Sequence, residues 1–198
     1  MTREEFHKTY WNYYLVLEER FNNVLRYIEL SEDNFSTYSY EFVNQLQAIV
    51  SEVDVIMKQI CGFLQKENKG INDYKGVILS KYSDITDQEV KISNITIKPF
   101  DNWQNEPLFW WKEYNKVKHG RANNFKLANM KNIINALAAL YILEMNYLKD
   151  ITSLNQDVDI PDKVSSLFTL VNWNNRYTSL ANSIGCLYEN SLSIITNS

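Results

Sequence analysis

The chain has 198 residues, of which 45% are hydrophobic and 22% are charged, and its formal net charge is -4. This length and balance predict one globular domain with its own core, and they exclude disordered, collagen-like and coiled-coil chains. The negative charge argues against a protein that coats nucleic acid or membrane through its overall charge, so any contact with a polyanion must be local.

Cysteine usage and hydropathy predict the compartment. Cys61 and Cys186 lie far apart and have no metal-type spacing, which favours a reducing environment. The charged N-terminus is followed by no continuous apolar segment, and the longest apolar run, 133–143, is far shorter than the roughly 20 residues that span a bilayer. We therefore expect a cytoplasmic protein without a membrane anchor.

The N-terminal third predicts two long amphipathic helices. Thr2 and Glu5 have the form of a capping box, and apolar residues then recur at steps of three and four, which predicts a helix over 3–29. A second helix is predicted over 39–65, with Ser39 as its N-cap. The connection is short, so an antiparallel pair is the simplest packing. The inner face of the first helix is expected to comprise Phe6, Tyr10, Tyr13, Leu17, Phe21, Val24 and Ile28.

The segment 66–103 interrupts the helical pattern. It contains two glycines, many polar residues and a β-branched run, and it is predicted to be an insertion that carries a strand or a hairpin. The alternation of the β-branched residues changes phase at Ser93 and Asn94, so either a bulge or a turn is expected there.

Two further helices are predicted in the second half. The first, over 106–120, begins where Asn105 caps well and Pro107 suits a first turn, and a loop over 121–124 follows it. The second, over 126–150, is apolar nearly all round in its middle and should be the most buried helix.

Beyond residue 150 the periodicity fades. Residues 151–198 are predicted to form an irregular tail, with 167–173 extended and a short helix within 180–195. The tail has few charges after Lys163, so we expect it to pack onto the helices or onto a partner chain. The fold class expected for 1–198 is one mainly α domain, an antiparallel four-helix bundle with a short β-containing insertion.

The segment 110–121 is the densest cluster of functional side chains. Helical spacing places four of them on one face, namely Trp111, Asn115, Lys118 and His119. Six cations and a single acid, Glu113, lie between residues 112 and 131, namely Lys112, Lys116, Lys118, Arg121, Lys126 and Lys131. Histidine exchanges protons near neutral pH, and neighbouring cations can stabilise a phosphorane, so His119 is a candidate acid or base for RNA cleavage. The alternative is that these side chains complement the dipole at a helix end capped by Gly120.

This segment also resembles a known family. The run Trp110, Trp111, Tyr114, Asn115, Lys118, His119 and Arg121, followed by Phe125 and an Asn- and Ala-rich apolar helix, is similar to the motif-bearing helix pair of the HEPN superfamily. That superfamily consists of helical bundles, commonly dimeric, and includes many toxin and abortive-infection ribonucleases. Its signature has an Arg before the His, and the His pairs with its copy across a dimer. This sequence departs from it, because Lys112, Glu113 or Tyr114 stands where the Arg is expected, and Lys does not replace a guanidinium.

The resemblance implies a homodimeric, metal-independent RNA endonuclease of toxin or phage-defence type. His119 is then the acid or base, Arg121 the transition-state cation, and Lys112, Asn115 and Lys118 the groups that position the phosphate. No cofactor or metal is expected, since metal-ligand spacings are absent from the sequence. The alternative is a non-catalytic helical interaction module, such as an antitoxin, scaffold or regulatory subunit, and the missing Arg favours it.

Three other features of the sequence bear on the site. Asp54 and Lys58 form an ordinary i,i+4 pair, although Asp54 is also a candidate supporting partner for Lys118 or Arg121. His7 is expected to be solvated beside acidic residues. One aromatic set is expected to belong to the core and not to a base-stacking surface: Trp103, Phe109, Trp110, Trp111, Tyr114 and Trp173.

Overall fold

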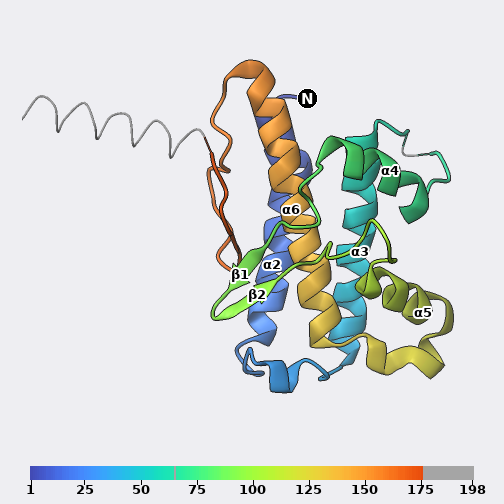
Figure 1. Cartoon of the computed structure of the whole chain (residues 1–198). Helices are drawn as coiled ribbons and strands as arrows, with labels where there is room; N and C mark the ends of the chain where they lie inside the picture. Colours follow the sequence, from blue (N-terminus) through green and yellow to red (C-terminus); the bar gives the residue numbers. More distant parts are fainter. Residues whose placement is uncertain (65, 176–198) are drawn as a thin grey trace, which may run out of the picture.

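The computed structural model describes residues 1–64 and 66–175, which form a mainly helical fold with a small antiparallel sheet (Figure 1). The helical elements are α1 (Arg3–Phe6), η1 (His7–Trp11), α2 (Asn12–Val24), η2 (Glu32–Asn34), α3 (Tyr40–Cys61), α4 (Ile71–Lys81), α5 (Phe109–Asn124), η3 (Phe125–Leu127) and α6 (Met130–Asn155). The strands are β1 (Val90–Ile92), β2 (Ile95–Ile97) and β3 (Thr169–Leu170), in the order β2-β1-β3. The predicted mainly α class is confirmed.

Helix α6 lies at the centre of the fold. Figure 1 shows it beside α2 and α3. Helix α5 meets its first turn, where the Asn132 amide donates to the Glu113 carboxylate. Every residue from Asn132 to Leu148 is buried, which confirms that this is the most buried helix. The helix begins at Met130, capped by Asn129, and continues to Asn155, so the predicted span of 126–150 is displaced toward the C-terminus at both ends.

The first helix begins as predicted and ends early. The Thr2 hydroxyl accepts from the backbone N–H of Glu5 at 3.1 Å, and the Thr2 backbone N–H donates to the Glu5 carboxylate at 2.7 Å, which is the capping box. The helix stops at Val24 and not at residue 29, because the chain turns immediately afterwards, with the Ile28 N–H bonded to the Val24 carbonyl.

A π-helical turn, η1, separates α1 from α2. The backbone N–H of Asn12 bonds to the carbonyl of His7, five residues back, so each turn here holds more residues than an α-helical turn. The next buried tyrosine is one residue later than predicted, whereas Leu17 and Phe21 are buried as predicted. Tyr14 is fully buried and Tyr13 is 43% exposed, so the predicted core position at Tyr13 is wrong.

Helix α3 follows its predicted start closely. The Ser39 hydroxyl accepts from the backbone N–H of Phe42 at 3.1 Å. The helix ends at Cys61 because Gly62 adopts φ +71°, a left-handed conformation that glycine tolerates, so the predicted end at residue 65 is too late.

The segment 66–103 holds a hairpin and a helix. β1 and β2 pair antiparallel with Ile92 opposite Ile95, and the turn lies at Ser93, which has φ 53°. The predicted hairpin and its turn are confirmed. Helix α4 was not predicted, because Gly76 lowers helix propensity and the apolar spacing is weak.

The tail turns back from α6 and runs along α1 and α2. We call residues 157–173 the C-terminal strap. It supplies β3, which pairs with β1 through Leu170 opposite Val90. The predicted packing onto the helices is confirmed for the strap, whereas Cys186 and the predicted helix within 180–195 lie outside the described residues.

A buried carboxylate holds the middle of the strap. Glu18 is 3% exposed and accepts from the Tyr14 hydroxyl at 2.5 Å and from the Ser165 hydroxyl. Its other oxygen accepts from the Ser166 backbone N–H at 2.8 Å and from the Ser166 hydroxyl at 2.7 Å. All four donors are satisfied by one side chain, so Glu18 fixes the strap to α2.

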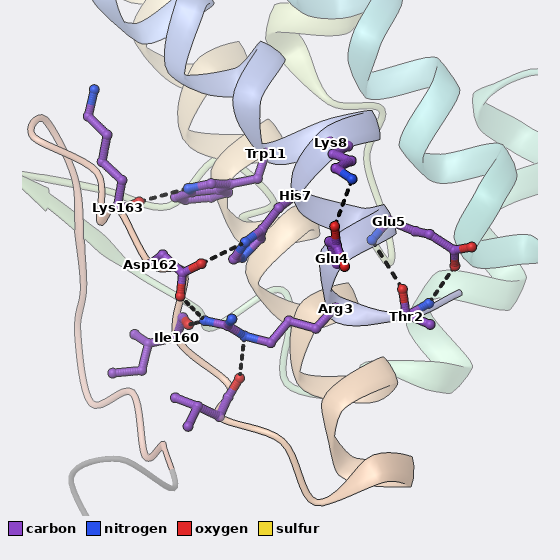
Figure 2. A network of polar contacts seen from close by, with 11 residues as sticks. Thr2, Arg3, Glu4, Glu5, His7, Lys8, Trp11, Ile160, Asp162 and Lys163 are labelled. Carbon is purple, nitrogen blue, oxygen red and sulfur yellow. Dashed lines mark hydrogen bonds and ion pairs between the residues drawn. The ribbon is translucent and has the colours of Figure 1, made fainter.

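A second network, around Arg3, holds the start of the strap (Figure 2). The Arg3 guanidinium donates to the carbonyl of Val158 at 3.1 Å, to that of Ile160 at 2.8 Å and to the Asp162 carboxylate at 2.6 Å. His7 reaches the same carboxylate, with 3.4 Å between Nδ1 and an Asp162 oxygen, and its side chain is 13% exposed. The prediction of a solvated His7 is therefore wrong.

Within residues 1–64 and 66–175, no helix combines the length and apolar character that crossing a membrane requires.

Candidate nucleic-acid interface

Helix α5 carries the cationic segment and is anchored by its aromatic residues. Four members of the aromatic set are buried, namely Trp103, Trp110, Trp111 and Tyr114. The indole N–H of Trp110 donates to the Pro99 carbonyl at 2.8 Å, which ties the start of the helix to the insertion. The prediction that these four belong to the core is confirmed, whereas Phe109 is 39% exposed.

The boundaries of α5 differ from the prediction at both ends. The helix begins at Phe109, after the segment 105–107 that was predicted to open it, and it runs to Asn124, through the predicted loop 121–124. Gly120 interrupts it with φ -154° and ψ 51°. His119 is therefore the last residue before a kink, and Arg121 the first residue after it.

The kink is held by a side chain. The Asn124 amide donates to the Gly120 carbonyl at 2.9 Å and to the Lys116 carbonyl at 3.2 Å, so carbonyls freed by the kink regain a partner. A Cβ added at Gly120 would lie 3.1 Å from that amide nitrogen, which is a tight contact. The backbone around His119 is thus held by local hydrogen bonds.

His119 and Arg121 are both exposed. Neither side chain makes a hydrogen bond or an ion pair with any residue in the described ranges. The same holds for the ammonium groups of Lys112 and Lys116, which are also exposed. These groups are accessible to a ligand from solvent.

The cations of this segment are not neutralised by acids. All ion pairs among the described residues involve other cations, namely Arg3, His7, Lys8, Arg20, Lys58, Lys69, Lys81 and Lys98. The single acid nearby, Glu113, accepts from the Asn132 amide at the start of α6. Lys118 and Lys131 instead lie over aromatic rings, at 5.7 Å from the centroid of Tyr114 and 5.3 Å from that of Phe109. The positive charge of this segment is therefore local and uncompensated.

Two cavities border the inner side of α5. One, of about 500 Å³, lies between α3, the start of α4 and α5, and its lining includes Asp54, Asn115 and Lys118. The other, of about 410 Å³, includes Lys112 and Asn115 in its lining. Asn115 thus borders both cavities.

The structure brings the predicted site residues together only in part. Trp111, Asn115 and Lys118 line the first cavity together, as their spacing suggested. His119 and Arg121 line neither of the two cavities and lie on the outer surface.

Asp54 has partners other than the predicted ones. Its carboxylate accepts from the Tyr74 hydroxyl at 2.7 Å and pairs with Lys58 at 2.9 Å, so the predicted i,i+4 pair is present. The alternative pairing with Lys118 or Arg121 is wrong, because Tyr74 from the unpredicted helix α4 occupies that carboxylate. Burial, and then the hydrogen bond to Asp54, raise the pKa of Tyr74, so it remains a donor.

Two functional-looking features were missed by sequence reasoning. Lys69 also lines the first cavity, but it lies in the insertion and no pattern marked it. Glu144 is fully buried in α6, and neither carboxyl oxygen has a hydrogen-bond partner among the described residues. Burial, reinforced by the charge of Glu52, holds the pKa of Glu144 well above its ordinary value, so the carboxyl is neutral in the core.

Comparisons with protein-family models, with curated proteins and with solved structures found no match. In the described part of the chain, no group of three or more His, Cys, Asp or Glu side chains is placed to hold a metal ion.

Proposed function

We propose that this protein is a metal-independent RNA endonuclease of toxin or phage-defence type, acting in the cytoplasm, and that its active surface is the solvent-exposed side of α5 together with the adjoining cavity edge. The observation that carries the proposal is the exposed, unpaired group of His119, Arg121, Lys112 and Lys116 on a protein with net charge -4. A polyanion gains most where positive charge is uncompensated, because contacts between Lys or Arg and phosphate dominate affinity for nucleic acid.

The proposed chemistry is an internal transfer within RNA. The 2′-oxygen forms a bond to the adjacent phosphorus, the bond from phosphorus to the 5′-oxygen breaks, and the products are a 2′,3′-cyclic phosphate and a 5′-hydroxyl. His119 removes the proton of the 2′-hydroxyl or protonates the leaving 5′-oxygen. Arg121 stabilises the charge that develops on the phosphorane oxygens.

The remaining predicted residues position the phosphate. Lys112 and Asn115 lie three residues apart on α5 and border the second cavity together, and His119 lies one turn beyond Asn115, outside both cavities. Lys118 lies on the inner edge of this face, over the ring of Tyr114. The RNA on either side of the scissile bond is then held along α5.

The proposal extends to the architecture. We take α5 as the fourth helix of a HEPN-like bundle with α2, α3 and α6, and 1–198 as one domain. One histidine supplies one of the two proton transfers, so a homodimer that pairs His119 with its copy supplies the other. Asp54 lines the first cavity and supports this arrangement only indirectly, by accepting a hydrogen bond from the Tyr74 hydroxyl.

A non-catalytic interaction module remains the second candidate. The observation that favours it is that no side chain of the described ranges orients the His119 ring, whereas acid-base residues are commonly held by a second group. In this case the protein is an antitoxin, scaffold or regulatory subunit, and its cationic face binds a protein partner without turnover.

Cleavage of single-stranded RNA in the presence of EDTA tests the proposal. Wild-type protein is expected to cleave, and His119→Ala to lower the rate by about 10²- to 10⁴-fold, the usual contribution of an acid-base residue. Asn123→Ala, which alters an exposed neighbour in the same helix, is the matched control and should cleave like the wild type. Thermal unfolding should show that all three proteins are equally folded.

Equal cleavage by wild type and His119→Ala contradicts the assignment of His119. No cleavage by the wild type, together with a stable complex with a protein partner, supports the interaction module instead.

A further inference from the structure

An exposed aromatic cluster lies beside the end of α5. Tyr40 is 77% exposed and Tyr38 is 41% exposed. Both pack against Phe125, with ring centroids 4.9 Å apart for Tyr40 and 5.5 Å apart for Tyr38. Single exposed aromatic residues are common, but here two exposed rings pack against the partly buried Phe125, tilted at 47° for Tyr40 and edge-on at 86° for Tyr38, which leaves the Tyr40 ring open to solvent. We call Tyr38, Tyr40 and Phe125 the aromatic platform.

The backbone beneath the platform is well fixed. Tyr38 forms an isolated β-bridge with Asn129, and the N–H of Met130 donates to the Thr37 carbonyl at 2.9 Å. Tyr40 is the first residue of α3, next to its N-cap. The platform therefore lies where the starts of α3 and α6 meet the end of α5, at the lower end of the molecule in Figure 1.

The platform is flanked by cations. Lys126 follows Phe125 directly, and Arg121 precedes it by one helical turn, or about 6 Å of rise. Lys126 and Arg121 are exposed and have no ion pair among the described residues. Aromatic faces beside unpaired cations match a single-stranded nucleic acid, whose bases stack and whose phosphates need positive charge. An apolar protein partner would leave these cations without a counterpart.

We propose that the aromatic platform stacks one or two unpaired bases of a single-stranded RNA whose phosphate backbone lies on α5. This inference rests on the proposed function and adds to it the substrate class, because a duplex keeps its bases stacked on one another and cannot offer them to the platform. Bases next to the scissile phosphate reach the platform because Phe125 follows the second part of α5 immediately.

The test separates base contacts from phosphate contacts. The first probe is a fluorescein-labelled 2′-O-methyl oligouridylate, which has no free 2′-hydroxyl and cannot be cleaved. The second is an abasic sugar-phosphate chain of the same length. Affinity is measured by fluorescence anisotropy with full-length protein. The variants are Tyr40→Leu, which removes the ring, Tyr40→Trp, which keeps a flat ring, and Tyr13→Leu, which removes an exposed tyrosine from the face of α2.

We expect Tyr40→Leu to weaken binding of the oligouridylate by at least about five-fold and to leave binding of the abasic chain unchanged. Tyr40→Trp and Tyr13→Leu should both bind the oligouridylate like the wild type. Thermal unfolding identifies any variant that fails to fold, and Tyr38→Leu then serves as the second probe of the platform.

Three results overturn the inference. If Tyr40→Leu binds the oligouridylate like Tyr13→Leu, or binds both probes more weakly by the same factor, the platform does not stack bases. In either case the proposed cationic surface stands if the wild type binds both probes. If the wild type binds neither probe, the proposed function fails and the platform fails with it, which leaves a protein partner as the occupant.

Discussion

The cationic end of α5 and the network under the C-terminal strap use charged residues in opposite ways. Under the strap, Arg3 makes three hydrogen bonds and Glu18 accepts four, so each charged group is matched by partners from a distant part of the chain. On α5, Lys112, His119 and Arg121 have no such partners among the described residues.

The difference separates a structural role from a binding role. A charge that is satisfied within the fold contributes to stability and has little left to offer a ligand. An exposed charge without partners contributes almost nothing to stability and keeps its capacity to bind. Substitutions under the strap should therefore lower the free energy of unfolding, and substitutions on α5 should change RNA binding alone.

The largest expected effect is that of Glu18→Ala. The change removes the common acceptor of Tyr14, Ser165 and Ser166 at a buried position, so the free energy of unfolding should fall by about 3 kcal/mol. Urea unfolding measures it, with Glu19→Ala at the exposed neighbouring position as the control. Amide exchange of Ser166 and Phe168 should also accelerate. A Glu18→Ala curve that overlays the control contradicts the role given to Glu18.

Glu144→Gln sharpens the comparison, because Glu144 is an unpaired acid in the core and not in water. A raised folded-state pKa gives stability that is present below the usual carboxyl pKa and is lost as pH rises toward the raised value. Gln cannot ionise, so the advantage of the variant over the wild type should grow as pH rises from 5 to 8, by up to about 1.4 kcal/mol per pH unit. Urea unfolding across this range measures the gain. Parallel pH profiles for the two proteins, like those expected for Glu19→Gln, contradict it.

A smaller effect is expected for Arg3→Ala. The guanidinium is partly buried and bonds two strap carbonyls, whereas its ionic partner Asp162 is 73% exposed and screened by water. The free energy of unfolding should fall by about 1 kcal/mol. Arg3→Lys should recover little of this loss, because an ammonium group cannot reproduce the several fixed N–H donors of the guanidinium. Lys8→Ala breaks an exposed pair and should change thermal stability little. Equal effects of Arg3→Ala and Lys8→Ala contradict the anchoring role of Arg3.

The sequence predicted those features of the fold that depend on contacts between neighbouring residues. The capping box of Thr2 and Glu5, the Ser39 cap and the turn at Ser93 depend on neighbouring residues, and all three are present. The π-turn was not predictable from periodicity, since the apolar residues at Tyr13 and Tyr14 fit either phase. Helix α4 was missed because tertiary packing of Tyr74 and Ile78 stabilises a segment with weak helical propensity.

The candidate site was likewise predictable only where its residues lie in one helix. Helical spacing placed Asn115 and Lys118 together, and the structure shows them in one cavity wall. The partners of Asp54 and His7 were not predictable, because Tyr74 and Asp162 come from segments whose packing no local pattern specifies. The kink at Gly120, directly after His119, was indicated by the sequence only as a helix end.

The salt dependence of RNA binding tests the central claim most directly. Affinity for the 2′-O-methyl oligouridylate is measured against salt concentration for wild type, for Lys112→Ala with Lys116→Ala, and for Lys91→Ala with Lys163→Ala. The last pair alters exposed lysines of equal charge, one on β1 and one on the strap. Two lost phosphate contacts should lower the logarithmic salt slope by about 1.4 for the α5 double variant alone. Identical slopes for the two double variants would contradict the claim that the unpaired cations of α5 form the RNA-binding surface.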